Sequence, residues 1–318
     1  MSLLIQGELK EDWFDKVSDK GEYVRKDSQF RNVISEDNVE SDRYHLYVSY
    51  ACPWAHRTLI FRQLKKLQEI ISVSVVHPFM DSKGWDFKSD FTNATGDTLY
   101  GVSRMHEIYT KAEPKYSGIV TVPVLWDKKT ETIVNNESLE IIRIFNNGFN
   151  SLLDNETSQL DFYPKDKQTE IDKINDKVYE NINNGVYRTG FATTQDSYEK
   201  SYNRLFGALD EMEEILSQQR YLVGSQITEA DWRLFVTLIR FDAVYVGHFK
   251  CNKKRIIDYP NLYNFMLELY QWQGVADTTH LDHIKHHYYY SHEMINPTQI
   301  IPIGPDQNLM QKHNRDRF

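Results

Sequence analysis

The sequence predicts an α/β domain followed by an all-helical domain. The chain has 318 residues, more than one hydrophobic core usually organises. Strand patterns alternate with helical patterns only in the first half, and after residue 149 the strand signals vanish. We therefore expect four consecutive segments: an N-terminal extension (1–43), an α/β domain (44–150), a helical domain (151–290) and an extended C-terminal tail (291–318).

The α/β domain begins with the order strand, helix, strand. Residues 44–50 have the pattern of a buried strand, and Pro53 fixes φ in the first turn of a helix. Residues 71–76 alternate as a second strand, which Pro78 ends. This order predicts a parallel pair of strands with a right-handed crossover.

The domain continues with a hairpin and a helix. The hairpin strands are expected at 124–127 and 132–134, and the helix at 138–145. The segment between the two halves holds one helical stretch near 103–111. The order βαβ followed by ββα is that of a thioredoxin-like domain.

The second domain shows helical patterns only, over 167–183, 198–218, 229–245 and 262–272. Thr228 and Asp231 have the spacing of a capping box, whose expected role is ordinary helix capping. The tail from Asn296 contains three prolines and is expected to be extended.

Composition narrows the classes of function. The chain is 40% hydrophobic and 26% charged, as in soluble globular proteins, and its net charge of −9 disfavours binding to nucleic acid. The N-terminus offers only residues 3–5 as an apolar run, which predicts neither a signal peptide nor a membrane span. Two cysteines, Cys52 and Cys251, provide no disulfide framework, so we expect a cytoplasmic protein.

Cys52 is the candidate nucleophile. It lies where the first strand meets the first helix, and free amides at a helix N-terminus lower cysteine pKa values to roughly 3.5–7.5. Ala55 stands where a dithiol oxidoreductase has its second cysteine, so an external thiol must resolve any mixed disulfide. The alternative is a buried structural cysteine, but Pro53 and the junction both favour exposure.

Two further segments are suited to bind a peptide-like ligand. Pro123 precedes a strand, which predicts a rigid, often cis, turn that leaves the backbone of Val122 available for pairing. Residues 136–138 (NES) open a helix, so their amides and hydroxyl are suited to a carboxylate, and Glu137 to an ammonium group. Taken alone, the first motif is more often a turn and the second a cap.

Taken together, the motifs resemble the glutathionyl-hydroquinone reductases, the Xi class of glutathione transferases, which are omega-like. The resemblance spans nearly the whole chain, with its motifs in a fixed order: 50–57 (YACPWAHR), 84–87 (GWDF), 116–127 (YSGIVTVPVLWD), 135–138 (NNES), 184–192 (NGVYRTGFA), 284–292 (IKHHYYYSH), 295–298 (INPT) and 304–305 (GP).

The resemblance implies a helical glutathione-transferase domain, glutathione as cosubstrate, no metal and a homodimer. It makes Cys52 the nucleophile. The other implied site residues are Val122 and Pro123 for the cysteinyl backbone of glutathione, Glu137 and Ser138 for its γ-glutamyl end, Trp85 beside the tripeptide, and Tyr187 and Tyr288 around an aromatic substrate.

Alternatives stay open at several of these positions. A tryptophan at the position of Trp85 is as often a core residue, and tyrosines in a helical domain are usually packing residues. Tyr289 is the alternative to its neighbour Tyr288 as the tyrosine that faces the site. Arg104 is a candidate for a further anion contact. The resemblance implies a basic residue at the position of Ile119, so one electrostatic contact to glutathione stays open.

The histidines of residues 280–292 suggest a metal site, since His283 and His287 are four residues apart. We disfavour it because no further ligand has a recognisable spacing. Cys251 is expected to be incidental, near the surface-like run 253–255.

The favoured function is a reductase that removes glutathione from S-glutathionyl-hydroquinones and related thioethers or mixed disulfides. A Cys52 mixed disulfide forms, and a second glutathione releases glutathione disulfide. A conjugating transferase is the nearest alternative, but it needs a Tyr or Ser hydroxyl beside the glutathione thiolate. A non-catalytic interaction module is the third. We expect no nucleic-acid or membrane partner.

Overall fold

The structure is a computed structural model that describes the chain except residues 1, 11–17, 19, 24–26 and 35–37. The chain forms two compact units. The first comprises Met1–Phe14, Lys26–Leu160 and Thr278–Glu293, and the second Asp15–Arg25, Asp161–Asp277 and Met294–Phe318. Within the described residues, every helix is too short or too polar to cross a bilayer.

The first unit is built on a four-stranded sheet with the order β4-β3-β8-β9. Its strands are β3 (Tyr44–Val48), β4 (Ile71–Val75), β8 (Val124–Asp127) and β9 (Thr132–Asn135). The β3 and β4 strands are parallel, whereas β8 is antiparallel to both β3 and β9. This topology confirms the predicted thioredoxin-like fold.

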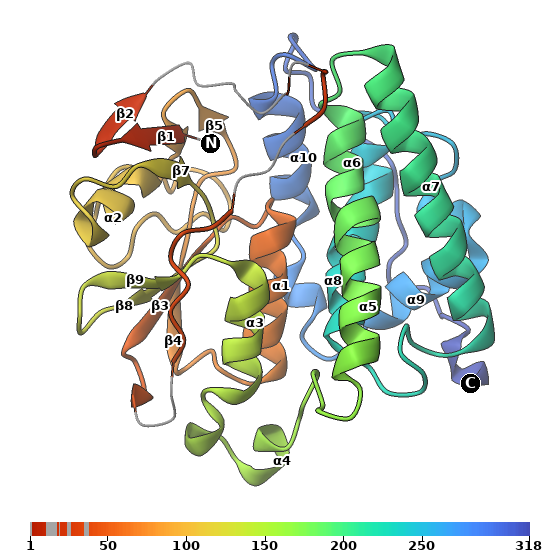
Figure 1. Ribbon diagram of the computed structural model, residues 1–318, viewed down its shortest axis with the longest axis horizontal. Coiled ribbons are helices and arrows are strands. Elements are labelled where there is room, and N and C mark those ends of the chain that lie inside the picture. Colours follow the sequence, from red (N-terminus) through yellow and green to blue (C-terminus); the bar gives the residue numbers. More distant parts are fainter. Residues whose placement is uncertain (1, 11–17, 19, 24–26, 35–37) are drawn as a thin grey trace. The chain divides into compact units, whose positions relative to one another are not determined.

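Three helices cover this sheet. Helices α1 (Pro53–Leu64) and α3 (Ser138–Asn147) pack side by side on one face, and α2 (Met105–Ala112) lies on the other (Figure 1). Because both faces are covered, all five residues of β3 are buried. Pro53 occupies the first turn of α1, as its fixed φ predicts.

Two small sheets were not predicted. Strands β1 (Ser2–Ile5), β2 (Glu8–Lys10) and β7 (Gly118–Val120) form an antiparallel sheet, so the expected N-terminal extension contributes two strands. Gln6 and Gly7 both have positive φ, as a two-residue hairpin turn requires. Strands β5 (Met80–Asp81) and β6 (Gly84–Trp85) form a second hairpin.

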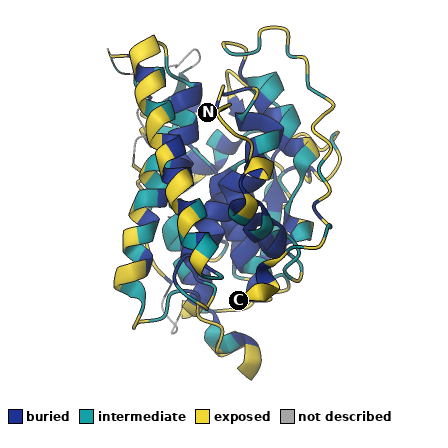
Figure 2. Ribbon diagram, turned by 90° about the vertical axis from the view of Figure 1, so that its right-hand side faces the viewer, coloured by how far each residue is buried: buried dark blue, intermediate teal, exposed yellow. Residues whose placement is uncertain are grey.

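The second unit is helical, as predicted. Its main helices are α5 (Gln168–Val178), α6 (Asn184–Gly190), α7 (Gln195–Gln218), α8 (Glu229–Arg240) and α9 (Pro260–Tyr270). The π-helical turns Tyr179–Asn183 and Phe241–Tyr245 extend α5 and α8 to the predicted ends. Thr228 and Asp231 form the expected capping box. The helices enclose buried residues and expose their outer faces (Figure 2).

Helix α10 (Leu281–Ser291) belongs to the first unit, although the sequence division groups it with the helical domain. The backbone NH of Met80 donates to Ser291 Oγ over 3.0 Å, which ties the helix to β5. The short helix α4 (Asn155–Ser158) also lies in the first unit. The two compact units follow contacts in space rather than the order of the chain. The division of the chain into four consecutive segments stays a prediction.

The C-terminal tail from Met294 onwards belongs to the second unit and forms one 3₁₀ turn, Arg315–Arg317. The Arg315 side chain is completely buried, and its guanidinium donates to the carbonyl oxygens of Leu216, Gln219 and Arg220. This anchoring fixes the end of the chain against α7.

Candidate active site

Cys52 lies at the predicted junction. It is the N-cap residue of α1, and its carbonyl oxygen accepts the first helical hydrogen bond, from the NH of His56. The thiol is partly exposed, and Sγ lies 3.5 Å from the carbonyl oxygen of Val122. The fold therefore brings the first two candidate motifs together.

The peptide bond between Val122 and Pro123 is cis, the conformation expected for this turn. The bond stands immediately before β8, and Val122 is almost completely buried. The backbone of Val122, rather than its side chain, faces the thiol.

Glu137 and Ser138 open α3. Glu137 is the N-cap residue, and its carboxylate accepts hydrogen bonds from the NH of Leu139 and from Ser28 Oγ, both over 3.2 Å. Ser138 is buried in the first helical turn. The capping role considered for this motif is thus present, and the half-buried carboxylate retains lone pairs for a ligand.

Trp85 is buried at the end of the β5–β6 hairpin. Its ring stacks on that of His287 in α10, with centroids 4.8 Å apart and planes 25° from parallel. Indole Nε1 is buried and has no hydrogen-bond partner among the described residues. Since buried indole NH groups are usually paired, this donor is a candidate ligand contact. The stacking on His287 was not predicted, because it joins segments far apart in sequence.

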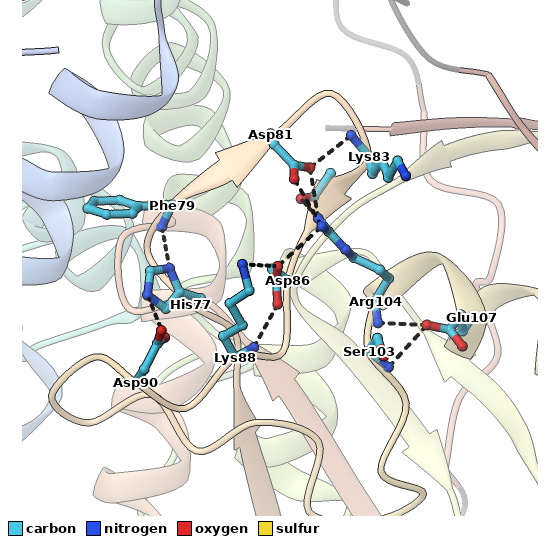
Figure 3. Close-up of polar contacts among 11 residues, drawn as sticks. His77, Phe79, Asp81, Lys83, Asp86, Lys88, Asp90, Ser103, Arg104 and Glu107 are labelled. Atoms are coloured by element: carbon cyan, nitrogen blue, oxygen red, sulfur yellow. Dashed lines mark hydrogen bonds and ion pairs between the residues drawn. The ribbon is translucent and has the colours of Figure 1, made fainter.

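An ion network holds this hairpin (Figure 3). The guanidinium of Arg104 contacts both carboxylate oxygens of Asp81, at 2.7 and 2.9 Å, and one oxygen of Asp86, at 3.2 Å. It also lies 3.4 Å from the carbonyl oxygen of Gly84, next to Trp85. Arg104 thus ties α2 to the hairpin and to Asp86, and its role as a further anion contact stays a prediction.

Tyr187 lies in α6, within the second unit, and belongs to an aromatic cluster. Its ring centroid is 6.1 Å from those of Tyr23 and Phe191, 6.2 Å from that of Tyr245 and 5.6 Å from that of Phe249. Tyr23 is buried, whereas Tyr187 is half-buried. Of these two stacked rings, Tyr187 is therefore the one that solvent can reach. Tyr23 is a neighbour that the sequence pattern did not indicate.

Tyr288 lies in α10, within the first unit. Its side chain is 1% exposed and packs against the rings of His287 and His292, with centroids 5.4 and 5.5 Å away. The adjacent Tyr289 is half-buried. The two tyrosines thus differ in their exposure.

The histidines of α10 bond to backbone carbonyls. His283 Nε2 lies 2.6 Å from the oxygen of Thr92, and His287 Nδ1 lies 2.9 Å from that of Pro78. In the described part of the chain, no three His, Cys, Asp or Glu residues are arranged to hold a metal ion. The two histidines instead tie α10 to the segment after β4.

Cys251 differs from its expected position near the surface. It is completely buried, and this burial raises the pKa of its thiol. A thiol in this environment stays protonated and is a poor nucleophile.

A thioredoxin-like unit with a cysteine at the N-terminus of α1, joined to a helical unit, defines the class of glutathione transferases. Sequence profiles agree: the glutathione S-transferase N-terminal domain matches residues 51–147 and the C-terminal domain residues 195–267.

Individual relatives define the branch. The chain is 52% identical over 327 aligned residues to glutathionyl-hydroquinone reductase YqjG of Escherichia coli (strain K12), covering 99% of each chain. It is 50% identical to glutathionyl-hydroquinone reductase PcpF of Sphingobium chlorophenolicum, over 97% of this chain and 98% of that protein. The glutathione-bound structure of Escherichia coli YqjG superposes with a TM-score of 0.91 and 50% identity, over 99% of this chain and 100% of that one.

The chain belongs to the glutathionyl-hydroquinone reductases, the Xi class of glutathione transferases, and is an enzyme of that family.

Proposed function

We propose that the chain removes glutathione from S-glutathionyl-hydroquinones, and from related thioethers and mixed disulfides, with Cys52 as the nucleophile. The observation that carries the proposal is the partly exposed thiol at the N-terminus of α1, 3.5 Å from the carbonyl oxygen of Val122. The partial positive charge at a helix N-terminus favours the thiolate over the thiol. Relatives named glutathionyl-hydroquinone reductases support the substrate class.

The first half-reaction breaks the bond between the aromatic carbon and sulfur. The Cys52 thiolate attacks the glutathione sulfur and forms a mixed disulfide. The electron pair of the broken bond stays on the aromatic ring, whose carbon takes up a proton, and the hydroquinone leaves. The substrate is reduced by two electrons, and the two sulfurs are oxidised.

The second half-reaction restores the enzyme. Because Ala55 replaces a second cysteine, the thiolate of a second glutathione attacks the mixed disulfide. Glutathione disulfide leaves, and Cys52 returns as a thiolate.

Three features support a glutathione site beside Cys52. The Val122 carbonyl oxygen lies close to Cys52 Sγ, which supports pairing of this backbone with a cysteinyl backbone. At the start of α3, Ser138 and the Glu137 carboxylate suit the carboxylate and ammonium of a γ-glutamyl group. The unpaired indole NH of Trp85 supplies a further donor.

Tyr187 and Tyr288 are proposed to bind the hydroquinone oxygen. A phenol that donates to this oxygen stabilises the charge that develops as the carbon–sulfur bond breaks. The partial exposure of Tyr187 supports its role. Residence in the cytoplasm and assembly as a homodimer stay predictions.

The experiment is a panel of glutathione-dependent assays on a glutathionyl-hydroquinone, a small mixed disulfide and a chloronitrobenzene conjugation substrate. We expect turnover of the first two substrates and little conjugation. A conjugating enzyme stabilises the glutathione thiolate with a Tyr or Ser hydroxyl, whereas Cys52 would form a disulfide with glutathione. Conjugation as the dominant activity would make the chain a conventional transferase. A lack of turnover on all three would favour an interaction module.

A further inference from the structure

Tyr109 joins two candidate glutathione-binding segments through its hydroxyl. The residue lies in α2, and its side chain is completely buried. Its hydroxyl lies 3.1 Å from the carbonyl oxygen and 3.2 Å from Oγ1 of Thr121, and accepts a 3.3 Å hydrogen bond from the Thr121 NH. It also accepts a 3.0 Å hydrogen bond from Asn136 Nδ2. Thr121 precedes Val122, and Asn136 precedes Glu137.

The hydrogen-bonding capacity of this phenol is filled. A phenol has one proton to donate and two lone pairs to accept with, and Tyr109 uses the proton on Thr121 and the lone pairs on Thr121 and Asn136. Burial raises the pKa of the Tyr109 hydroxyl, so the hydroxyl keeps its proton at neutral pH.

Asn136 is fixed from its other side by the N-terminal segment. Its Oδ1 accepts from the NH of Phe30 over 3.2 Å, and its backbone NH donates to the Phe30 carbonyl over 3.0 Å. Asn136 is 5% exposed, so water does not replace these partners. Because the Asn136 side chain is held by the phenol, the phenol also helps to fix the backbone of Glu137, the next residue along the chain.

The bonds form one path between the two halves of the candidate site. It runs from Cys52 Sγ to Val122, through Thr121 to the Tyr109 hydroxyl, and on to Asn136, ahead of Glu137. The sheet pairing of β8 with β9 also links the two segments. That pairing contains an irregularity at Leu125 and Trp126, near the Pro123 turn.

We propose that Tyr109 is a positioning residue that sets the distance between the segment holding the cysteinyl part of glutathione and the segment holding its γ-glutamyl end. The role rests on the glutathione site of the proposed function. The hydroxyl touches no substrate and acts through Thr121 and Asn136. It therefore governs the affinity for glutathione and not the chemistry at Cys52.

The test is Tyr109→Phe, which removes one oxygen and keeps the ring in place. Binding of reduced glutathione to the reduced enzyme is measured by calorimetry, and turnover of a small mixed disulfide is measured against glutathione concentration. We expect Kd and KM for glutathione to rise about tenfold, the scale of one net hydrogen bond, while kcat at saturation changes less than about twofold.

Tyr116→Phe is the matched control. Tyr116 is also buried, with its ring centroid 5.1 Å from that of Tyr109, but its hydroxyl donates to the carbonyl oxygen of Ile119 in β7 over 3.2 Å. This variant loses a buried hydroxyl from the same cluster without breaking the link between the two segments. We expect this variant to lose as much stability towards urea as Tyr109→Phe. Its affinity for glutathione should equal that of the wild type.

Asn136→Ser gives an independent variant, because the shorter side chain does not reach the phenol. Its loss of affinity should be at least that of Tyr109→Phe, because serine also loses the contact of Oδ1 with the Phe30 NH, and the double variant should lose little more than Asn136→Ser alone. Asn136→Ser decides the question if Tyr109→Phe does not fold.

The outcomes separate the two proposals. Wild-type enzyme that does not bind glutathione contradicts the proposed function itself. If the wild type binds, unchanged affinity in Tyr109→Phe or Asn136→Ser overturns the positioning role. Equal losses of affinity in Tyr109→Phe and Tyr116→Phe also overturn it, since they would reflect general loosening of the cluster.

Discussion

The Sγ atom of Cys52 lies 3.5 Å from the carbonyl oxygen of Val122, a residue 70 positions further along the chain. Sheet pairing explains this proximity. Because β3 and β8 are antiparallel, with Tyr47 opposite Val124, the end of β3 meets the start of β8. The junction that carries Cys52 and the turn that carries Pro123 therefore lie at the same edge of the sheet.

The aromatic site is tested with Tyr187→Phe and Tyr288→Phe. If each phenol donates to the hydroquinone oxygen mainly in the transition state, kcat/KM on glutathionyl-hydroquinones should fall about 10–100-fold, or roughly 1.4–2.7 kcal/mol. Turnover of a small mixed disulfide, which has no phenol, should hardly change. Steady-state kinetics on both substrates measure the difference.

Tyr289→Phe is the control for Tyr288→Phe, since the two residues are neighbours in α10. We expect wild-type kinetics from this variant. Equal losses on both substrates would assign the tyrosines to the fold or to glutathione binding. No loss on either would leave them as packing residues.

Trp85→Phe tests the buried indole NH. Phenylalanine can still stack on His287, but it lacks the donor, so the Kd for glutathione should rise about tenfold. Calorimetric titration with reduced glutathione measures this change. Trp126→Phe is the control: it removes an indole NH that donates to the Tyr100 hydroxyl over 3.0 Å, within the same unit. We expect the control to lose stability only, and wild-type affinity in Trp85→Phe would make Trp85 a core residue.

His45 makes the stability of the protein depend on pH. Its side chain is buried in β3, with its ring nitrogens 2.7 and 2.9 Å from the hydroxyls of Ser72 and Ser74. Burial lowers its pKa from 6.5 to about 4, so the unfolded chain binds more protons than the folded one between these values. We therefore expect the stabilising contribution of neutral His45 to be present above pH 6.5 and to be lost as the pH falls towards 4, by about 3 kcal/mol.

Urea unfolding at pH 7 and pH 4.5 measures this dependence. Other buried histidines add to the loss in the wild type. Burial lowers the pKa of His248, for example, to about 4. In His45→Asn the loss between the two pH values should be smaller by most of the contribution of His45. The same loss in the variant and the wild type would contradict the assignment.

Local sequence patterns were sufficient to predict the main secondary structure and the place of Cys52. Strand β3, the Pro53 helix start and the β8–β9 hairpin each depend on neighbouring residues, so periodicity and turn chemistry predict them. The turn at Pro123 and the cap at Glu137 were predictable for the same reason.

Contacts between distant segments were not predictable. Strand β1 has four residues, and its partner β7 is far along the chain, so the short apolar run gave no periodic signal. The stacking of Trp85 on His287 and the bonds of Tyr109 likewise join residues that no local pattern connects. These contacts support the proposed glutathione site.

The central claim is that Cys52 forms a mixed disulfide with glutathione, and the mass of the intact protein after exposure to glutathione disulfide tests it most directly. Wild-type protein and Cys251→Ser should gain one glutathionyl group, removable by reduced glutathione, because Cys251 is buried and unreactive. Cys52→Ser should gain none, and should lose all but a few per cent of turnover. A glutathionyl group on Cys52→Ser, or none on the wild type, would contradict the account.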